Sequence, residues 1–195
     1  MKLRFIQENL REGDILCGRN NLSLEGELIR AIVGSESNHN AIIIYHAKHG
    51  YGIGDMSPPY GRFQPFSHYE KLRNDSGYGV RILRIKGITV SEGRRMSIAW
   101  HNHAEGKEYS SAGVKRLWIY KFINSLPWHI QGTWCTRAIG IICGAVFPAS
   151  KNIFRKIYVK GMPLKKNETP RTVENRLVQG LLEDVTDQVM HKSTC

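Results

Sequence analysis

The chain has 195 residues and a formal net charge of +11 at pH 7, from 28 Lys and Arg against 17 Asp and Glu. Hydrophobic residues at 41% and charged residues at 23% exclude wholesale disorder, and 19 Gly and 7 Pro without a repeat exclude collagen-like and solenoid chains. The basic balance predicts nonspecific attraction to polyanions, such as nucleic acid, anionic lipid head groups or anionic cell-wall polymers.

The start of the chain and its apolar runs bear on localisation. No apolar run approaches the roughly 20 residues that a membrane span requires, so we expect no transmembrane segment. An apolar segment of signal-peptide length does not follow residues 1–8. We therefore expect a protein that is cytoplasmic as synthesised. A role in the cell envelope would depend on delivery by lysis, injection or a secretion machinery.

Five elements are expected in the first half of the chain. In chain order they are a turn and short strand over 11–18, a helix over 23–34, a strand over 37–46, its hairpin partner over 51–56, and a strand over 80–85. The run from Ala41 to Tyr45 is dominated by Ile, which predicts a strand buried on both faces. Ser57-Pro58-Pro59 ends the hairpin.

The second half is expected to be mainly helical. Helices are predicted over 90–105, 114–124 and 133–146, and residues 153–159 predict either a strand or a basic arm. Thr169-Pro170 opens a terminal helix whose apolar stripe, from Val173 to Val189, has to dock on the body of the protein or on a partner, and the width of the stripe favours the body. The last residues, 192–195, are expected to fray. We divide the chain into a domain over 1–150 and a basic arm with an amphipathic helix over 151–195.

The basic residues have one local excess, from Lys151 to Lys166, where there is no acid. This segment is either a solvated face or a polyanion-binding patch, and the sequence does not decide between them. The four cysteines lack the paired spacing of a zinc site, and four is low for a disulfide scaffold. We expect no metal site, and the useful question is whether one cysteine is a nucleophile.

Three residues have placements that suit thiol chemistry. His39 begins a buried strand, Asp55 ends the next strand, and Cys135 begins an apolar helix. A helix N-terminus and an adjacent imidazolium lower the pKa of a thiol, and an acceptor on the second ring nitrogen holds the imidazole in one orientation. The free amides of the first helical turn can stabilise an oxyanion. Each residue alone also has a structural interpretation: a satisfied histidine, a turn-capping carboxylate and a small buried hydrophobe.

Short motifs surround these residues in a definite order. They are Gly13-Asp14-Ile15-Leu16, Ser37-Asn38-His39, Asp55 before Met56, Gly106-Lys107-Glu108-Tyr109, and Trp134-Cys135-Thr136. Together they resemble the circularly permuted papain-like proteins of the NlpC/P60 superfamily. The similar branch has the His before the Cys, and it includes YiiX/YaeF-like proteins and relatives of lecithin:retinol acyltransferase. The resemblance covers about residues 11–147.

The resemblance implies an α+β, permuted papain-like fold: a small antiparallel sheet or partial barrel packed on helices, here with a C-terminal helical appendage. It also implies Cys135 as the nucleophile, His39 as the general base and later acid, and Asp55 as the orienting group, with no cofactor. Asp55 stands where the family usually has Glu, so Asn38 or Tyr51 remains an alternative orienting residue.

Four further residues are expected to contact substrate. They are Asn38, Asn40, Trp134 and Thr136. Asn40 replaces a Gly or Ala that is common in the family, and Thr136 replaces Ser.

The implied activity is that of a cysteine peptidase or amidase, with peptidoglycan stem peptides or another cell-wall peptide as substrate. One alternative is an acyltransferase or hydrolase directed at lipid or thioester bonds at a membrane surface. A second is a cationic binding module without activity. The sequence does not indicate the oligomeric state.

Overall fold

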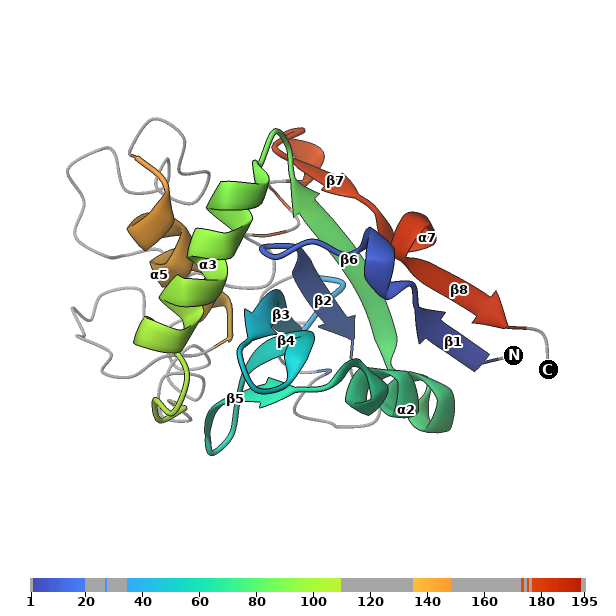
Figure 1. Ribbon diagram of the computed structural model, residues 1–195. Helices are drawn as coiled ribbons and strands as arrows, with labels where there is room; N and C mark the ends of the chain where they lie inside the picture. Colours follow the sequence, from blue (N-terminus) through green and yellow to red (C-terminus); the bar gives the residue numbers. More distant parts are fainter. Residues whose placement is uncertain are drawn as a thin grey trace, which may run out of the picture.

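The computed structural model describes residues 2–19, 27, 35–109, 135–148, 173, 175 and 177–193 (Figure 1). In chain order the elements are β1 (Lys2–Phe5), the 3-10 helix η1 (Gln7–Asn9), β2 (Ile15–Arg19), β3 (His39–His46), β4 (Gly50–Ser57), β5 (Tyr60–Gln64), α2 (Phe66–Ser76), β6 (Gly79–Ile85), α3 (Val90–His103), α5 (Cys135–Val146), β7 (Leu182–Asp184), α7 (Thr186–Val189) and β8 (Met190–Ser193).

One antiparallel sheet organises the molecule. Its strand order is β5-β4-β3-β2-β6-β7, and β1 pairs with β8 in a separate two-stranded sheet. β3 lies centrally and pairs with β2 on one side and β4 on the other, so the predicted hairpin is confirmed. The α+β class is therefore confirmed as well.

Both faces of the sheet are covered, which explains the run of isoleucines in β3. Ile42 and Ile44 belong to a core cluster formed with α3 and α5, whereas Ile43 belongs to a second cluster formed with α2, β1 and α7. All three isoleucines are fully buried, as predicted for a strand between two layers. In Figure 1, α3 and α5 lie side by side against the sheet, and α2 lies close to β1.

The predicted helix over 90–105 is confirmed as α3. Its start is fixed by a capping box, in which Thr89 and Glu92 each accept a hydrogen bond from the other's backbone N–H. The apolar helix predicted over 133–146 is described from Cys135 onward as α5, with Ile139 and Ile142 buried against the sheet.

The C-terminal part differs from the prediction. Gly180, with φ near 70°, ends the helical segment, since its N–H bonds to the carbonyl of Leu177. β7 then joins the main sheet beside β6, and β8 pairs with β1. A single helix reaching Val189 is therefore wrong, and so is fraying at 192–193. The last three apolar residues of the predicted stripe, Leu182, Val185 and Val189, are buried against the sheet instead, whereas Val178 is exposed.

Several predictions lie outside the described residues. They concern the helices over 23–34 (of which Glu27 alone is described, as helical) and 114–124, the basic segment Lys151–Lys166, and the side chains of Trp134 and Thr136. The division of the chain at residue 150 stays a prediction. Among the described helices, none combines the length and the apolar character needed to cross a bilayer.

Candidate thiol site

His39 and Asp55 are joined directly. His39 is the first residue of β3 and Asp55 lies near the end of β4, so the antiparallel hairpin brings both to one end of the sheet. The Nε2 atom of His39 lies 2.7 Å from Oδ1 of Asp55. The shorter Asp side chain therefore reaches the imidazole of His39.

The Asp55 carboxylate is held by further donors. Ser57 Oγ donates to Oδ2 at 3.0 Å, and the Tyr69 hydroxyl of α2 also donates to this carboxylate. Burial of Asp55, which is only 4% exposed, acts to raise its pKa. The positive charge and hydrogen bond of His39, with the bonds from Ser57 and Tyr69, outweigh burial and lower the pKa. Asp55 is consequently a stable anion at neutral pH.

Cys135 completes the cluster. It is the first residue of α5 and is 6% exposed, and its side chain makes a hydrogen bond with His39. Since Nε2 of His39 faces Asp55, Nδ1 is the ring nitrogen left for the thiol. The structure thus brings together residues 39, 55 and 135 from three separate elements.

Electrostatics in the cluster favour a protonated imidazole. Burial acts to lower the pKa of His39, but the Asp55 charge, the hydrogen bond to Asp55 and the interactions with Cys135 raise it well above its ordinary value. An imidazolium beside a sulfur at a helix N-terminus is the environment that stabilises a thiolate. The arrangement can therefore support nucleophilic attack by sulfur and proton transfer by the ring.

The other predicted site residues are less defined. Asn38 and Asn40 flank His39 and are buried, and the backbone N–H of Asn38 donates to the Gly18 carbonyl at 3.0 Å. Tyr51 is 47% exposed and packs edge-on against Tyr45, so the alternative that it orients His39 is wrong.

Two tyrosines at the site were not predicted from the sequence. Tyr69 and Tyr78 are buried with their rings 6.0 Å apart, and a Cβ on Gly18 would overlap the Tyr78 hydroxyl. Gly18 is the register partner of His39, so the Tyr78 hydroxyl lies on the face of the sheet from which His39 projects. Burial and the nearby charges of Asp55 and Cys135 raise the pKa of both hydroxyls, which keeps them protonated as donors. No sequence motif indicated them: Tyr69 lies on α2, which was not predicted, and Tyr78 lies between α2 and β6.

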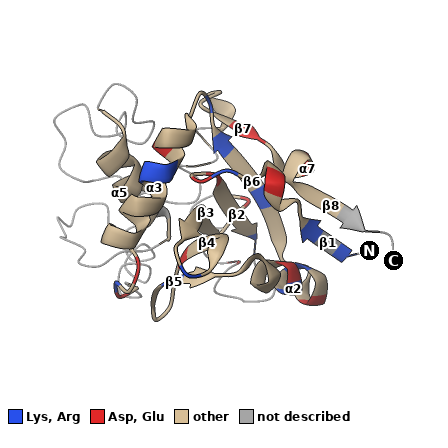
Figure 2. Ribbon diagram, viewed as in Figure 1, with Lys and Arg blue, Asp and Glu red and all other residues tan. Residues whose placement is uncertain are grey.

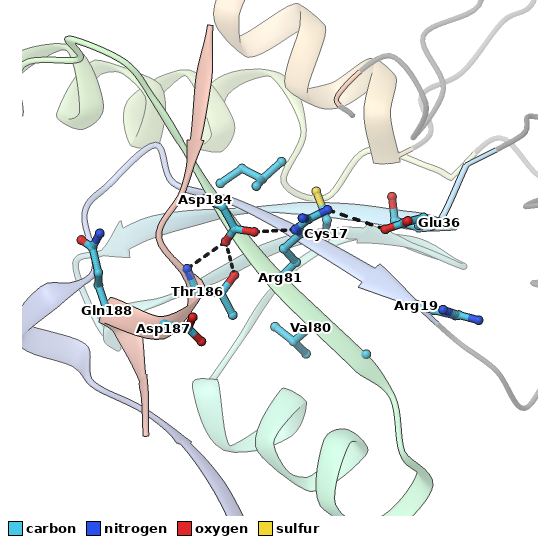
Figure 3. Close-up of a pocket in the computed structure, with 12 residues that line it drawn as sticks. Cys17, Arg19, Glu36, Val80, Arg81, Asp184, Thr186, Asp187 and Gln188 are labelled. Atoms are coloured by element: carbon cyan, nitrogen blue, oxygen red, sulfur yellow. Dashed lines mark hydrogen bonds and ion pairs between the residues drawn. The ribbon is translucent and has the colours of Figure 1, made fainter. Parts of the chain in front are cut away.

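A pocket of about 660 Å³ opens beside β6 and β7 (Figure 3). Arg81 crosses it, with Nε 2.6 Å from Oδ2 of Asp184 and NH1 3.7 Å from Oε2 of Glu36. Figure 2 likewise shows basic residues of β6 beside acidic residues of β7. Among its described lining residues, Ser37 comes nearest in sequence to the thiol site, and none belongs to the Cys135 cluster.

Histidines also gather at the opposite end of β3. The ring of His46 lies 4.7 Å from that of His49 and 5.4 Å from that of His101, and Nδ1 of His101 lies 2.7 Å from Oε2 of Glu105. Within the described ranges, no group of three or more His, Cys, Asp or Glu side chains is arranged to hold a metal ion.

Comparison with solved structures shows a similar fold in the crystal structure of the metalloprotein YiiX from Escherichia coli O157:H7. The TM-score is 0.57 at 15% sequence identity, and the match covers 91% of this chain and 97% of that one. Neither protein-family models nor curated protein sequences give a match. At this identity the likeness establishes a similar fold, and activity has to be argued from the site.

Proposed function

We propose that this protein is a cysteine hydrolase of the permuted papain-like type that cleaves an amide, ester or thioester bond. Cys135 is the nucleophile, His39 the general base and then acid, and Asp55 the group that orients and charges the imidazole. The observation that carries the proposal is the 2.7 Å contact between His39 and Asp55 on a ring that also bonds Cys135 at the start of α5.

The reaction uses the side chains of this cluster, the backbone amides at the start of α5 and water. The Cys135 sulfur attacks the acyl carbon while the imidazolium of His39 retains the thiol proton. When the tetrahedral adduct collapses, the bond to the leaving group breaks and His39 protonates that group, leaving a thioester on Cys135. His39 then takes a proton from water, hydroxide adds to the thioester carbon, and the acid is released with the thiol restored. Amides at the start of α5 stabilise the oxyanion in both halves.

The fold and the sequence support this proposal independently. The similarity to YiiX is a similarity of fold, whereas the order of the motifs around His39, Asp55 and Cys135 comes from the sequence. We take peptidoglycan stem peptides, or another cell-wall peptide, as the substrate class, because the resemblance implies it and the charge of +11 suits an anionic wall.

Alkylation of individual cysteines as a function of pH tests the site. Cys135 is expected to react well below the pH of a free thiol, whose pKa is about 8.5, and to lose this reactivity in His39→Ala. Cys143, fully buried in the core, is the internal control. Hydrolysis of purified peptidoglycan and of simple acyl substrates by wild type and Cys135→Ala then tests the activity, and equal rates would refute it.

A further inference from the structure

A cationic side chain lies next to the thiol site on strand β5. Arg62 is the register partner of Asp55, and directly paired residues of antiparallel strands direct their side chains to the same face, with Cβ atoms about 4.5–5.5 Å apart. Arg62 is therefore anchored beside the carboxylate that orients His39. Of the described basic residues, it is the one that stands opposite a member of the cluster.

The charge of Arg62 is not neutralised by the described part of the protein. No Asp or Glu lies within salt-bridge distance of it there, and its Nε atom is buried without a hydrogen-bond acceptor. Asp55 already accepts from His39, Ser57 and Tyr69. The first turn of α2, which follows β5, carries no acidic residue. A buried guanidinium N–H ordinarily has an acceptor, and Arg62 as a whole is only half-buried, so a ligand that reaches the exposed part of the guanidinium can supply the missing acceptor.

His68 stands on the same side of the site. It is in the first turns of α2, and its ring packs edge-on against Tyr69, the donor to Asp55, with ring centroids 5.4 Å apart. Burial and the Arg62 charge lower the pKa of His68, against the opposing effect of Asp55. At neutral pH its imidazole is therefore uncharged and can donate one N–H.

We propose that Arg62, assisted by His68, is a specificity-determining residue that binds an anionic group of the acyl substrate, a carboxylate or a phosphate, beside Cys135. The inference rests on the proposed function, because it assigns the substrate of that same site. Arginine suits either anion, since its planar guanidinium pairs with two oxygens at once.

Labelling of Cys135 by two small alkylating agents of different charge tests the proposal without knowledge of the substrate. The ratio of the rate with iodoacetate, which is anionic, to that with iodoacetamide, which is neutral, is measured at pH 7 by peptide mass spectrometry. We expect Arg62→Met to lower this ratio about threefold, as the loss of one nearby unit charge predicts. Arg62→Lys keeps the charge and is expected to retain most of the ratio.

Arg95→Met is the matched control. Arg95 is exposed on α3, in the part of that helix that packs on Gly13 near the start of β2. His39 pairs with Gly18 at the other end of β2, so Arg95 lies away from the thiol site. The control removes the same charge and is expected to leave the ratio unchanged. Iodoacetate labelling is then repeated in the presence of inorganic phosphate or acetate at equal ionic strength. The preferred anion is the one that slows labelling of wild type more than it slows labelling of Arg62→Met.

The two proposals fail in different ways. An unchanged ratio in Arg62→Met, with Cys135 still reactive at low pH in a manner that depends on His39, overturns the role of Arg62 and leaves the proposed function standing. An equal fall in Arg95→Met also overturns it, because the effect would then be one of total charge. Absence of His39-dependent reactivity in the wild type instead overturns the proposed function, and with it this inference.

Discussion

Tyr69 donates a hydrogen bond to Asp55, so helix α2 fixes the carboxylate that faces His39. The tyrosine is 2% exposed, and burial together with the Asp55 charge raises the pKa of its hydroxyl, which stays protonated. The cluster of His39, Asp55 and Cys135 is therefore supported from outside by the hydrogen bond that Tyr69 donates to the carboxylate. A carboxylate held in this way keeps both its charge and its orientation.

Replacement of Tyr69 by Phe is expected to cost about 1.5–3 kcal/mol of stability at pH 7, the range for a hydrogen bond to a charged group. This bond lowers the pKa of Asp55, so its contribution is present above the unfolded value of about 3.9 and is lost as the pH falls through the folded value. The measurement is the free energy of unfolding of wild type and Tyr69→Phe in urea at pH 7 and at pH 3. Tyr51→Phe, at an exposed ring, is the control. An equal loss of stability at pH 7 and pH 3 would contradict a hydrogen bond from Tyr69 to the charged Asp55 carboxylate.

Asp55→Asn is expected to slow alkylation of Cys135 at pH 6 by about tenfold or more. The carboxylate raises the pKa of His39, and each pKa unit corresponds to a factor of ten in the balance between imidazolium and neutral ring. The variant should therefore move the acid limb of the pH profile upward. Asp75→Asn, which removes an exposed carboxylate from α2, should leave the profile unchanged. A profile that is identical in wild type and Asp55→Asn would remove Asp55 from the proposed mechanism.

Asp14, from the Gly-Asp-Ile-Leu motif, has a structural role that the sequence did not reveal. Both of its carboxylate oxygens accept from Arg84 of β6, at 2.8 and 2.7 Å, and Asp14 is 1% exposed. Gly13, with φ near 89°, makes the turn before it. The motif thus fixes β2 against β6 and indirectly positions Gly18 beside His39.

Removal of one partner of this buried pair should be costly. We expect Asp14→Ala to lower the free energy of unfolding by about 3–5 kcal/mol, because the Arg84 guanidinium is left buried without its counter-charge. The measurement is urea unfolding, with exposed Asp187→Ala as the control. Under conditions where the variant stays folded, the ratio of Cys135 to Cys143 alkylation should match wild type. Selective loss of Cys135 reactivity would instead give Asp14 a role at the site.

The sequence was most informative where local pattern and burial agree. The isoleucine run of β3 predicts a strand between two layers, and the capping residues Thr89 and Glu92 mark the start of α3. The three residues of the thiol cluster could be selected because their placement at the ends of elements suits thiol chemistry. Their proximity depends on the sheet register, which no local pattern specifies.

Helix α2 could not be predicted because its signals are weak. Only Phe66 and Tyr69 are buried, the N-cap is Pro65 without a side-chain bond, and the last turn contains Asn74-Asp75-Ser76, which is typical of a loop. Its formation depends on packing against β1 and the sheet. Tyr69, and with it the support of Asp55, was missed for this reason.

The C-terminal error has a different cause. Leu182, Val185 and Val189 are spaced as on one helical face, yet each is buried against the sheet after the turn at Gly180. The pairing of β7 with β6 supplies hydrogen bonds that outweigh the helical pattern of the side chains. A helix interior glycine costs about 1 kcal/mol relative to alanine, and this small signal was the indication of a break.

The charged form of His101 should stabilise the protein at acidic pH, and this stabilisation should be lost as the pH rises. Its Nε2 lies 2.9 Å from the carbonyl oxygen of Tyr45, and its Nδ1 lies 2.7 Å from a carboxylate oxygen of Glu105. Since both partners accept, both ring nitrogens carry protons and the ring is an imidazolium that ties α3 to the end of β3. Burial acts to lower the pKa of His101, but the bonds to Tyr45 and Glu105 and the charges of Glu105 and Glu12 raise it.

A group whose pKa is raised by folding stabilises fully below its unfolded value, about 6.5 here, and this stabilisation is lost as the pH rises through the folded value. The difference in melting temperature between wild type and His101→Gln should therefore be largest at pH 6 and shrink by pH 9. His39 contributes in the same direction but equally in both proteins. His103→Gln, at an exposed ring two residues away, should follow wild type throughout. A constant difference across this range would show that His101 acts by packing, with no contribution from its charge.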